Sequence, residues 1–387
     1  MKYFFVSCPI HFENELIKEI EGFWHLMMDL DGLPTREALP EFEIDKGGLL
    51  FQCSLHLGLQ INLFSHIANR VLLRHIDFKA RYFDQFEKEF KKIDFSKIFN
   101  FTMDKKITIE IESSKSRLFH EKNLTETMTK ILNEKKIQLV SDSENRIFIR
   151  LFNDIVTVSI DTTGEHLHFR GYRKHQGAAP IRENLAYLTL QIAGLTTADQ
   201  KTILDPFCGS GTILFESVLN GIPHGFLQMN RSFPFFNLQI TPALFKSPTW
   251  IKNYKWLKPT QHKLLGLEKD LETLNKAVLN QKIFSDLYFV PNLTLTHIDS
   301  SKCELQTLDL SAADPLWIVT NPPYGERLSS EEIPAILKRF ESLEMLRGMI
   351  VLHPTDWKFQ FQRLKVSLSI PFSNQGLKLS LSIFKPT

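Results

Sequence analysis

The feature of this sequence that most restricts its fold is a repeating alternation of short apolar runs and amphipathic stretches after residue 180. Apolar runs that predict buried strands cover residues 202–204, 264–267, 294–298, 317–320 and 348–352. Helical spacing of the apolar residues predicts helices over 184–194 and 212–220. Alternation of this kind is typical of α/β proteins, in which helices cover both faces of a mostly parallel sheet.

The last part of the chain predicts a different kind of strand pair. Apolar and polar residues alternate over 364–370 and again over 377–383, and the polar turn Ser373-Asn374-Gln375-Gly376 separates the two runs. This pattern predicts an antiparallel hairpin, which would complete a sheet of seven strands. The segment 226–258 interrupts the alternation with two tryptophans and several phenylalanines, so we expect an ordered insertion over the top of the sheet.

The first 164 residues predict smaller α+β domains. Residues 3–8 and 46–52 read as strands around a helix at 12–20, and a second block places a helix at 59–70 before strands at 107–112, 146–151 and 155–160. A turn at 161–164 leads into a predicted strand at 167–171 and a polar loop at 172–177. We therefore expect domains at 1–56, 57–164 and 165–387.

Composition excludes several classes of protein. Hydrophobic residues make up 43% and charged residues 23% of the chain, which is typical of a globular protein and unlike a disordered one. The four cysteines contain no CxxC pair, so we expect neither a zinc site nor a disulfide framework, and no metal. No apolar stretch reaches the ~18 residues of a membrane span. We expect a cytoplasmic protein without a membrane partner.

The charge of the chain is unevenly distributed, although its formal net value is only +2. Residues 1–73 contain 5 Lys and Arg against 10 Asp and Glu, whereas residues 74–136 contain 15 against 11. A basic segment is compatible with nucleic-acid binding and equally with solvated helix faces, so the charge alone does not decide between them.

A glycine-containing turn follows the first strand of the predicted parallel sheet. Leu204-Asp205-Pro206-Phe207-Cys208-Gly209-Ser210-Gly211-Thr212 lies where a strand ends and a helix begins. Glycines there let the backbone approach a ligand closely, and the start of a helix offers free N–H groups. The turn lacks the third glycine of a dinucleotide motif and the Lys of a P-loop, which disfavours both of those ligands.

Carboxylates end the next two strands. Glu268 and Asp270 follow the second strand, and Glu268 is placed to accept hydrogen bonds from both hydroxyls of a ribose. Asp299 ends the third strand, where it could accept from an adenine amino group or simply be a solvated strand end.

The fourth strand ends in a proline pair. In Asn321-Pro322-Pro323-Tyr324, two fixed φ angles and two missing N–H donors leave a stiff frame of acceptors beside an aromatic ring. We interpret it as a site for a planar base with an exocyclic amine. The side-chain oxygen of Asn321 and the carbonyl of Pro322 would accept the amine hydrogens, while Tyr324 stacks on the ring.

These residues together resemble a known family. The segments 205–212 and Asn321-Pro322-Pro323-Tyr324-Gly325-Glu326-Arg327, with 167–173, 179–186 and the early Gly47-Gly48-Leu49-Leu50-Phe51, look like the THUMP-domain guanine-N2 RNA methyltransferases, whose bacterial members modify large-subunit ribosomal RNA. The resemblance covers nearly the whole chain. It implies a ferredoxin-like domain, a THUMP RNA-binding domain and a Rossmann-like class I methyltransferase domain, in that order.

The resemblance also implies roles for single residues. S-adenosylmethionine (SAM) would be surrounded by Asp205, Phe207, Gly209, Gly211, Thr212 and Asn321, with its ribose on Glu268 and its adenine on Asp299. The target base would meet Asn321, Pro322 and Tyr324 as the catalytic set. Structured RNA, 23S rRNA by this resemblance, would be held by Lys105, Lys106, Lys115, Arg117, Arg170, Arg173, Lys174 and Arg182.

The sequence also departs from the family and leaves alternatives open. The family commonly has Asp at Glu268, so either Glu268 or Asp270 could be the ribose ligand. No second methyltransferase half follows, which implies a single activity, and the match over 226–258 is loose. A tRNA substrate, transfer to adenine N6, and a non-catalytic RNA-binding or assembly factor are the alternative functions.

Overall fold

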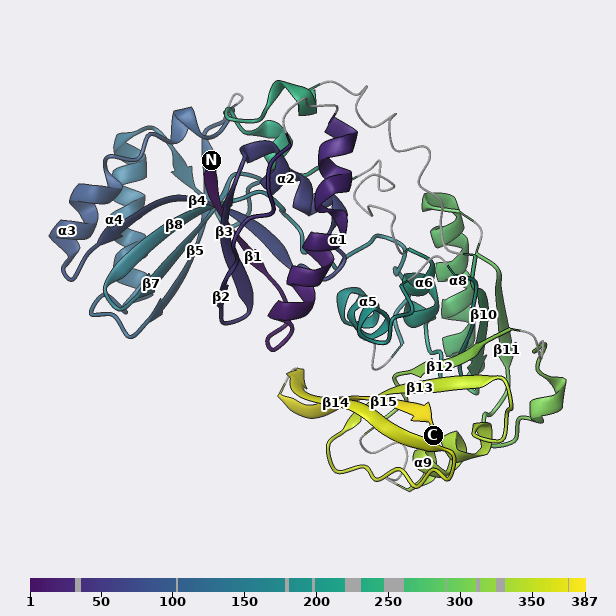
Figure 1. The fold of residues 1–387 in the computed structure, drawn as a ribbon. Coiled ribbons are helices and arrows are strands. Elements are labelled where there is room, and N and C mark those ends of the chain that lie inside the picture. Colours follow the sequence, from purple (N-terminus) through teal and green to yellow (C-terminus); the bar gives the residue numbers. More distant parts are fainter. Residues whose placement is uncertain are drawn as a thin grey trace. The chain divides into compact units, whose positions relative to one another are not determined.

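A computed structural model describes residues 1–31, 36–101, 104–177, 181–196, 199–219, 231–246, 261–289, 291–310, 314–324, 331–374 and 376–387. These residues form two compact units, each with its own sheet (Figure 1). The N-terminal unit consists of residues 1–9, 16–167 and 230–254, and the C-terminal unit of residues 10–15, 168–229 and 255–387.

The N-terminal unit is built on an eight-stranded sheet in the order β2-β3-β1-β4-β8-β7-β5-β6. Its strands are β1 (Lys2–Ser7), β2 (Glu43–Asp45), β3 (Gly48–Cys53), β4 (Arg70–Lys79), β5 (Lys106–Ser114), β6 (Gln138–Leu139), β7 (Arg146–Phe152) and β8 (Ile155–Asp161). Its helices are α1 (Glu13–Asp31), whose first turn belongs to the other unit, α2 (Leu55–Phe64), α3 (Phe83–Phe90) and α4 (Glu121–Glu134). Figure 1 shows α3 and α4 side by side.

The two N-terminal ranges predicted as separate domains share this sheet. β1 pairs antiparallel with β3 on one side and with β4 on the other, so residues before and after position 56 alternate in one hydrogen-bonded array. The assignment of these ranges to ferredoxin-like and THUMP domains stays a prediction.

The helix predicted over 59–70 is wrong in its second half. α2 ends at Phe64, and β4, which the sequence pattern did not predict, begins at Arg70. The physical reason lies in Glu19, a buried carboxylate of α1 that accepts hydrogen bonds from the hydroxyl of Ser65 and from the backbone N–H of His66 at 2.7 Å. These bonds turn the chain out of the helix.

The predicted insertion also lies elsewhere. Residues 231–246, with the short 3-10 helices η2 (Pro234–Asn237) and η3 (Ala243–Lys246), belong to the N-terminal unit and not to the top of the C-terminal sheet. Leu238 forms a β-bridge with Phe99, and Phe235 packs its ring against Phe245. Apolar burial in the N-terminal unit therefore decides where this segment lies. Residues 226–230 and 247–258 of the predicted insertion lie outside the described residues.

The C-terminal unit contains the predicted α/β sheet, in the order β11-β10-β9-β12-β13-β15-β14. Its strands are β9 (Thr202–Asp205), β10 (Lys263–Glu268), β11 (Leu293–His297), β12 (Leu316–Thr320), β13 (Leu346–Pro354), β14 (Leu364–Asn374) and β15 (Leu377–Pro386). Strands β9 to β13 pair in parallel, whereas β15 pairs antiparallel with β13 and β14. The seven-stranded sheet and its closing hairpin, yellow in Figure 1, are confirmed.

Helices and a continuous apolar core position the loops of this sheet. The helices are α5 (Glu183–Ile192), α6 (Thr212–Val218), α8 (Leu271–Leu287) and α9 (Glu332–Phe340), of which the residue pattern predicted α5 and α6. One buried cluster links β9, β12 and α9 through Leu204, Ile318 and Leu337. Since no helix in the described part of the chain is long and apolar enough to cross a membrane, a membrane span is not found there.

The strand predicted over 167–171 is wrong. This segment is irregular, and its side chains bond to a helix instead of its backbone pairing in a sheet. Arg170 is completely buried with its Nη2 3.4 Å from Oε2 of Glu216 in α6, and the hydroxyl of Tyr172 donates to Oε1 of the same carboxylate at 2.9 Å. Buried ion pairing with α6 therefore decides the path of this segment.

Candidate active site

The carboxyl ends of β9, β10, β11 and β12 meet at one edge of the C-terminal sheet, which is where ligands bind in open α/β sheets. A cavity of about 900 Å³ opens there. Nine of the residues singled out from the sequence line it: Asp205, Phe207, Gly209, Thr212, Glu268, Asp270, Asp299, Asn321 and Pro322. Four loops that are far apart in the sequence therefore form one site.

The glycine-containing turn is held against the neighbouring strand. The N–H of Cys208 donates to the carbonyl of Leu267 at 3.0 Å, and Gly209 and Gly211 have φ angles of +55° and +87°. Gly209 lines the cavity, and a Cβ built on it would meet nothing within 4 Å. Gly211 does not line the cavity. A Cβ there would lie 2.6 Å from the ring of Phe215, so Gly211 allows α6 to pack closely on the turn.

Asp205 ends β9 with its side chain in the interior. Only 2% of the residue is exposed, and its Oδ1 accepts hydrogen bonds from the hydroxyl of Thr320 at 2.7 Å and the N–H of Phe207 at 3.0 Å. Burial raises the pKa of Asp205 to about 7, because removing the carboxylate from water outweighs these two bonds. Asp205 thus links the ends of β9 and β12 at the floor of the cavity.

Two carboxylates follow β10, and they have different partners. Glu268 is half-buried, and its oxygens accept from the N–H of Gly209 at 3.1 Å and the N–H of Asp270 at 2.9 Å. Asp270 is the N-cap of α8, where its Oδ1 accepts from the N–H of Thr273 at 2.7 Å, and this bonding lowers the pKa of Asp270. Because Asp270 is engaged in capping, Glu268 is the carboxylate whose position is set by the glycine turn.

Asp299 follows β11 and lines the cavity with its neighbours Ser300 and Ser301. Its Oδ1 accepts from the hydroxyl of Ser301 at 2.7 Å and from the N–H of Ser301 at 2.9 Å, and these bonds lower the pKa of Asp299. The hydroxyl of Ser300 donates to the carbonyl of Pro206, which ties this loop to the glycine turn.

The proline pair after β12 forms the opposite wall of the cavity. Asn321, Pro322 and Pro323 line it, with Pro322 buried and Asn321 half-buried. Tyr324 is not among the lining residues. It packs against the apolar core, and burial raises the pKa of its hydroxyl. Gly325, Glu326 and Arg327, the rest of the motif, lie outside the described residues.

One positioning residue was missed by the sequence analysis. Asn280 of α8 is completely buried, and its amide nitrogen donates to the carbonyls of His175 at 2.8 Å and Ser210 at 3.2 Å, while its oxygen accepts from the N–H of His175 at 3.0 Å. It thereby joins the 172–177 loop to the glycine turn. The spacing of Ala277, Asn280 and Phe284 puts this amide on the buried face of α8, a signal that the sequence contains.

Two of the expected RNA contacts are wrong because their side chains are inside the protein. Arg170 has no exposed surface. The side chain of Arg173 is 5% exposed, with Nη2 3.0 Å from Oε2 of Glu183, and it also donates to the carbonyl of Ile181. Both guanidinium groups neutralise buried carboxylates, which would be costly without a partner.

The remaining expected cations are exposed or half-buried but do not form one cluster. Lys174 is exposed and Arg182 half-buried in the C-terminal unit. Lys105 and Lys106 lie where β5 begins, whereas Lys115 and Arg117 follow its end, about 30 Å away at ~3.3 Å per residue. No group of three His, Cys, Asp or Glu side chains suited to a metal ion is found within the described ranges.

Comparison with known proteins relates the part of the chain that contains this site to a family of methyltransferases. Residues 170–349 match the family model of the RMKL-like methyltransferase domain. This part of the chain is similar to that family's methyltransferase domain. The matched range begins at the buried arginine, includes the glycine turn, Glu268, Asp299 and the proline pair, and ends in β13.

Relatives and solved structures extend the likeness beyond the RMKL-like domain. The ribosomal RNA large subunit methyltransferase K/L of Colwellia psychrerythraea is 27% identical over 355 residues, which cover 87% of this chain and 46% of that protein. The chain thus spans about half the length of the curated relatives it matches. A Listeria monocytogenes protein described as a predicted N6-adenine-specific DNA methylase has a TM-score of 0.75 at 22% identity, covering 100% of this chain and 96% of its own.

The structure of SMU.472 complexed with SAH has a TM-score of 0.74 at 23% identity, covering 100% of this chain and 99% of that chain. At these identities the two structures establish the fold. An α/β, Rossmann-like class I methyltransferase fold is therefore confirmed for the C-terminal unit.

Proposed function

We propose that the protein is a SAM-dependent RNA methyltransferase that modifies N2 of a guanosine in 23S rRNA. The observation that carries the proposal is the convergence of Glu268 and the Asn321–Pro322 acceptors on one cavity beside the glycine turn. The RMKL-like domain and the relatives named as ribosomal RNA large subunit methyltransferases support the same reaction and substrate. An rRNA substrate would place the protein in the cytoplasm.

The lining of the cavity fits SAM. Its volume of about 900 Å³ falls within the ~300–1,000 Å³ of small-molecule sites. Gly209 leaves open space where any other residue would place a side chain, and Glu268 stands beside it as a carboxylate suited to a diol. When bound, SAM supplies a methyl group on a positively charged sulfur, and the ionised form of Asp205 would provide a favourable negative charge nearby.

The Asn321 and Pro322 acceptors would orient the amine of the target base. The lone pair of this amine is delocalised into the purine ring, which makes it a weak nucleophile. By accepting both N–H groups, the side chain of Asn321 and the carbonyl of Pro322 favour a pyramidal nitrogen whose lone pair faces the methyl donor. Alignment of two bound reactants can supply roughly 7–11 kcal/mol, so a strong base is not required.

The test uses methyl-labelled SAM and total RNA from cells that lack the protein, with ribosomal and transfer RNA separated and digested to nucleosides. We expect label in N2-methylguanosine from large-subunit RNA. The same nucleoside from transfer RNA would change the substrate, and label in N6-methyladenosine would overturn the base assignment. SAM binding without label would favour the non-catalytic alternative.

A variant pair tests the role of the proline loop. Asn321→Ala should lower turnover by about a hundredfold or more, because it removes a preorganised hydrogen-bond partner of the reacting amine, while the Kd for SAM changes little. Asn275→Ala, on the exposed part of α8, is the matched control and should leave both values unchanged. Equal losses of turnover and SAM affinity in Asn321→Ala would contradict the role.

A further inference from the structure

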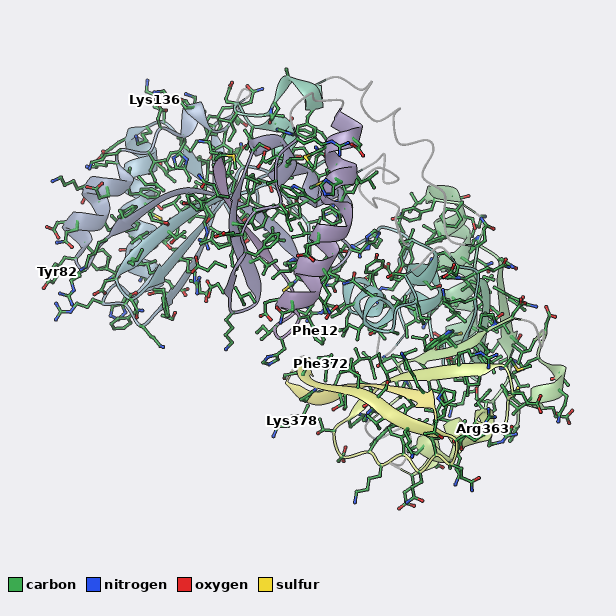
Figure 2. All side chains as sticks on the ribbon, in the orientation of Figure 1. Phe12, Tyr82, Lys136, Arg363, Phe372 and Lys378 are labelled. Atoms are coloured by element: carbon green, nitrogen blue, oxygen red, sulfur yellow. The ribbon has the colours of Figure 1, made fainter. Side chains whose placement is uncertain are left out.

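One end of the N-terminal sheet displays aromatic and basic side chains together. We define the aromatic–basic tip as residues 79–82 at the end of β4, residues 114–120 at the end of β5, and residues 152–155 at the β7–β8 turn. Lys79 of β4 pairs with Ile155 of β8, and Ser114 of β5 pairs with Phe152 of β7, so the three segments are neighbours. Figure 2 shows Tyr82 at this outer edge of the N-terminal unit.

Asp154 holds the three segments of the tip together. Its Oδ2 accepts from Nε of Arg81 at 2.9 Å, its Oδ1 accepts from the N–H of Arg117 at 2.8 Å, and its carbonyl accepts from the N–H of Ala80 at 2.9 Å. Asn153 and Asp154 adopt φ angles of +51° and +63°, as a tight two-residue hairpin turn requires. The three segments of the tip are therefore fixed to one another. The hydrogen bonds lower the pKa of Asp154, and its negative charge is engaged by groups of the tip itself.

Three aromatic side chains remain exposed on this surface: Tyr82 is 53% exposed, Phe119 59% and Phe152 36%. Nζ of Lys115 lies 5.5 Å from the ring centre of Phe152, and the guanidinium of Arg117 lies 5.5 Å from that of Tyr82, whose hydroxyl it contacts through Nη1 at 2.7 Å. The aromatic rings thus orient the cations. Phe119, whose ring centre lies 4.0 Å from that of His120, and Tyr82 both keep exposed surface for a ligand.

The charge of the tip selects the kind of ligand. Its cations are Lys79, Arg81, Lys115 and Arg117, and its one carboxylate is Asp154. A surface with three excess positive charges and exposed rings between them matches a chain of phosphates and bases. Unpaired bases offer flat faces for stacking, whereas the bases of a duplex are stacked on one another and cannot reach these rings.

We propose that the aromatic–basic tip binds an unpaired stretch of the RNA substrate, with bases stacked on Tyr82 and Phe119 and phosphates on Lys115 and Arg117. The inference rests on the proposed function in assuming an RNA substrate. It differs from a general basic surface in two respects. It assigns the binding to one end of β5 and not to Lys105 and Lys106 at the other, and it requires aromatic stacking as well as charge.

The test measures fluorescence anisotropy of the full chain with a short labelled oligouridylate and with an RNA duplex, over a range of salt concentrations. Tyr82→Ala and Phe119→Ala should each weaken binding of the oligouridylate about 5- to 150-fold, as expected for the loss of one stacked base. Duplex binding should change much less. Lys115→Ala and Arg117→Ala should each reduce the slope of log K against log salt by about 0.7.

Matched controls separate the tip from general effects on the fold. Tyr3→Ala removes a tyrosine with the same 53% exposure from β1 and should bind the oligouridylate like the wild type. Tyr82→Phe keeps the ring and should retain most of the affinity, although it removes the hydrogen bond to Arg117. Circular dichroism of each variant checks that the N-terminal sheet is intact.

The outcomes distinguish this inference from the proposed function. Wild-type affinity in both aromatic variants would overturn it, even where the protein methylates RNA. Stacking-dependent binding by a protein that transfers no methyl group would support the tip and contradict the proposed function. Equal losses on oligouridylate and duplex would overturn the preference for unpaired RNA. Binding to phosphatidylserine vesicles that is lost in the same variants, without oligouridylate binding, would assign the tip to a membrane and overturn the proposal.

Discussion

Replacing Asp205 by Asn should stabilise the protein in a strongly pH-dependent way. The carboxyl group has a pKa of about 7 in the folded protein against 3.8 for the unperturbed group. Between these values the folded state holds a proton that the unfolded chain has lost, so stability falls as the pH rises from about 4 to about 7. The difference corresponds to about 4 kcal/mol, by which burial of the charge destabilises the protein above pH ~7.

Asparagine cannot ionise, yet its oxygen still accepts from Thr320 and Phe207. The free energy of unfolding of Asp205→Asn should therefore exceed that of the wild type by up to about 4 kcal/mol near pH 8, and by far less near pH 5. Urea unfolding followed by tryptophan fluorescence, analysed for two transitions, measures both values. Asp286→Asn, an exposed position on α8, is the control and should show no pH-dependent difference. An equal gain at both pH values, or no gain near pH 8, would refute the reasoning.

The same ionisation should affect cofactor affinity in the opposite direction. SAM carries a positive sulfur, so its binding should be stronger when Asp205 is ionised, and the affinity of the wild type should rise as the pH increases through about 7. In Asp205→Asn this rise should disappear. Isothermal titration across this pH range checks it, and a parallel rise in both proteins would assign the effect to another group. A rise in the wild type alone would show that Asp205 favours cofactor binding at the expense of protein stability.

Three further predictions concern the turn and its supports. Glu268→Gln should weaken SAM binding by about tenfold, because a charged hydrogen-bond partner is lost. Asp270→Asn should not weaken it, because Asn also caps helices. Titration calorimetry compares the two, and equal losses would contradict the assignment of Glu268 as the ribose ligand. Gly211→Ala should destabilise the protein by about 2–4 kcal/mol in urea unfolding, since a clash with α6 adds to the strain at positive φ. Gly194→Ala, with φ +72° and open space, should show the strain alone. Asn280→Ala should lower the free energy of unfolding by about 3 kcal/mol, and an unchanged urea midpoint would contradict its role as a link between loops.

The parallel sheet could be predicted because its strands are short apolar runs. Their alternation with helical segments along the chain is enough to indicate a mostly parallel sheet. The site followed from the same pattern, since the ends of parallel strands meet at one edge. Nine predicted residues therefore line one cavity. Gly211 and Tyr324 do not line it. For Tyr324 the reason is that a proline frame restricts the backbone but does not determine the direction in which the following side chain packs.

The errors arose where a distant side chain overrides a local pattern. Nothing near 59–70 indicates that Glu19 ends the helix, and nothing near 167–171 indicates that Glu216 draws Arg170 into the interior. Charge was a poor guide to RNA contacts for the same reason. An arginine in a polar stretch is predicted to be exposed as long as its buried carboxylate partner is not known. The tip was not predicted as a surface, because its rings and cations come from three segments that are brought together by Asp154.

The placement of residues 231–246 has a consequence for biosynthesis. This segment completes the N-terminal unit, yet the ribosome makes it after β9 and α6 of the C-terminal unit. Domains usually fold in the order of synthesis. Here all strands of the N-terminal sheet leave the ribosome before residues 231–246, whose Leu238 pairs with Phe99. The folding of the two units must therefore overlap in time. A nascent chain halted near residue 220 should expose apolar surface of the N-terminal unit that becomes covered once residues 231–246 have left the ribosome.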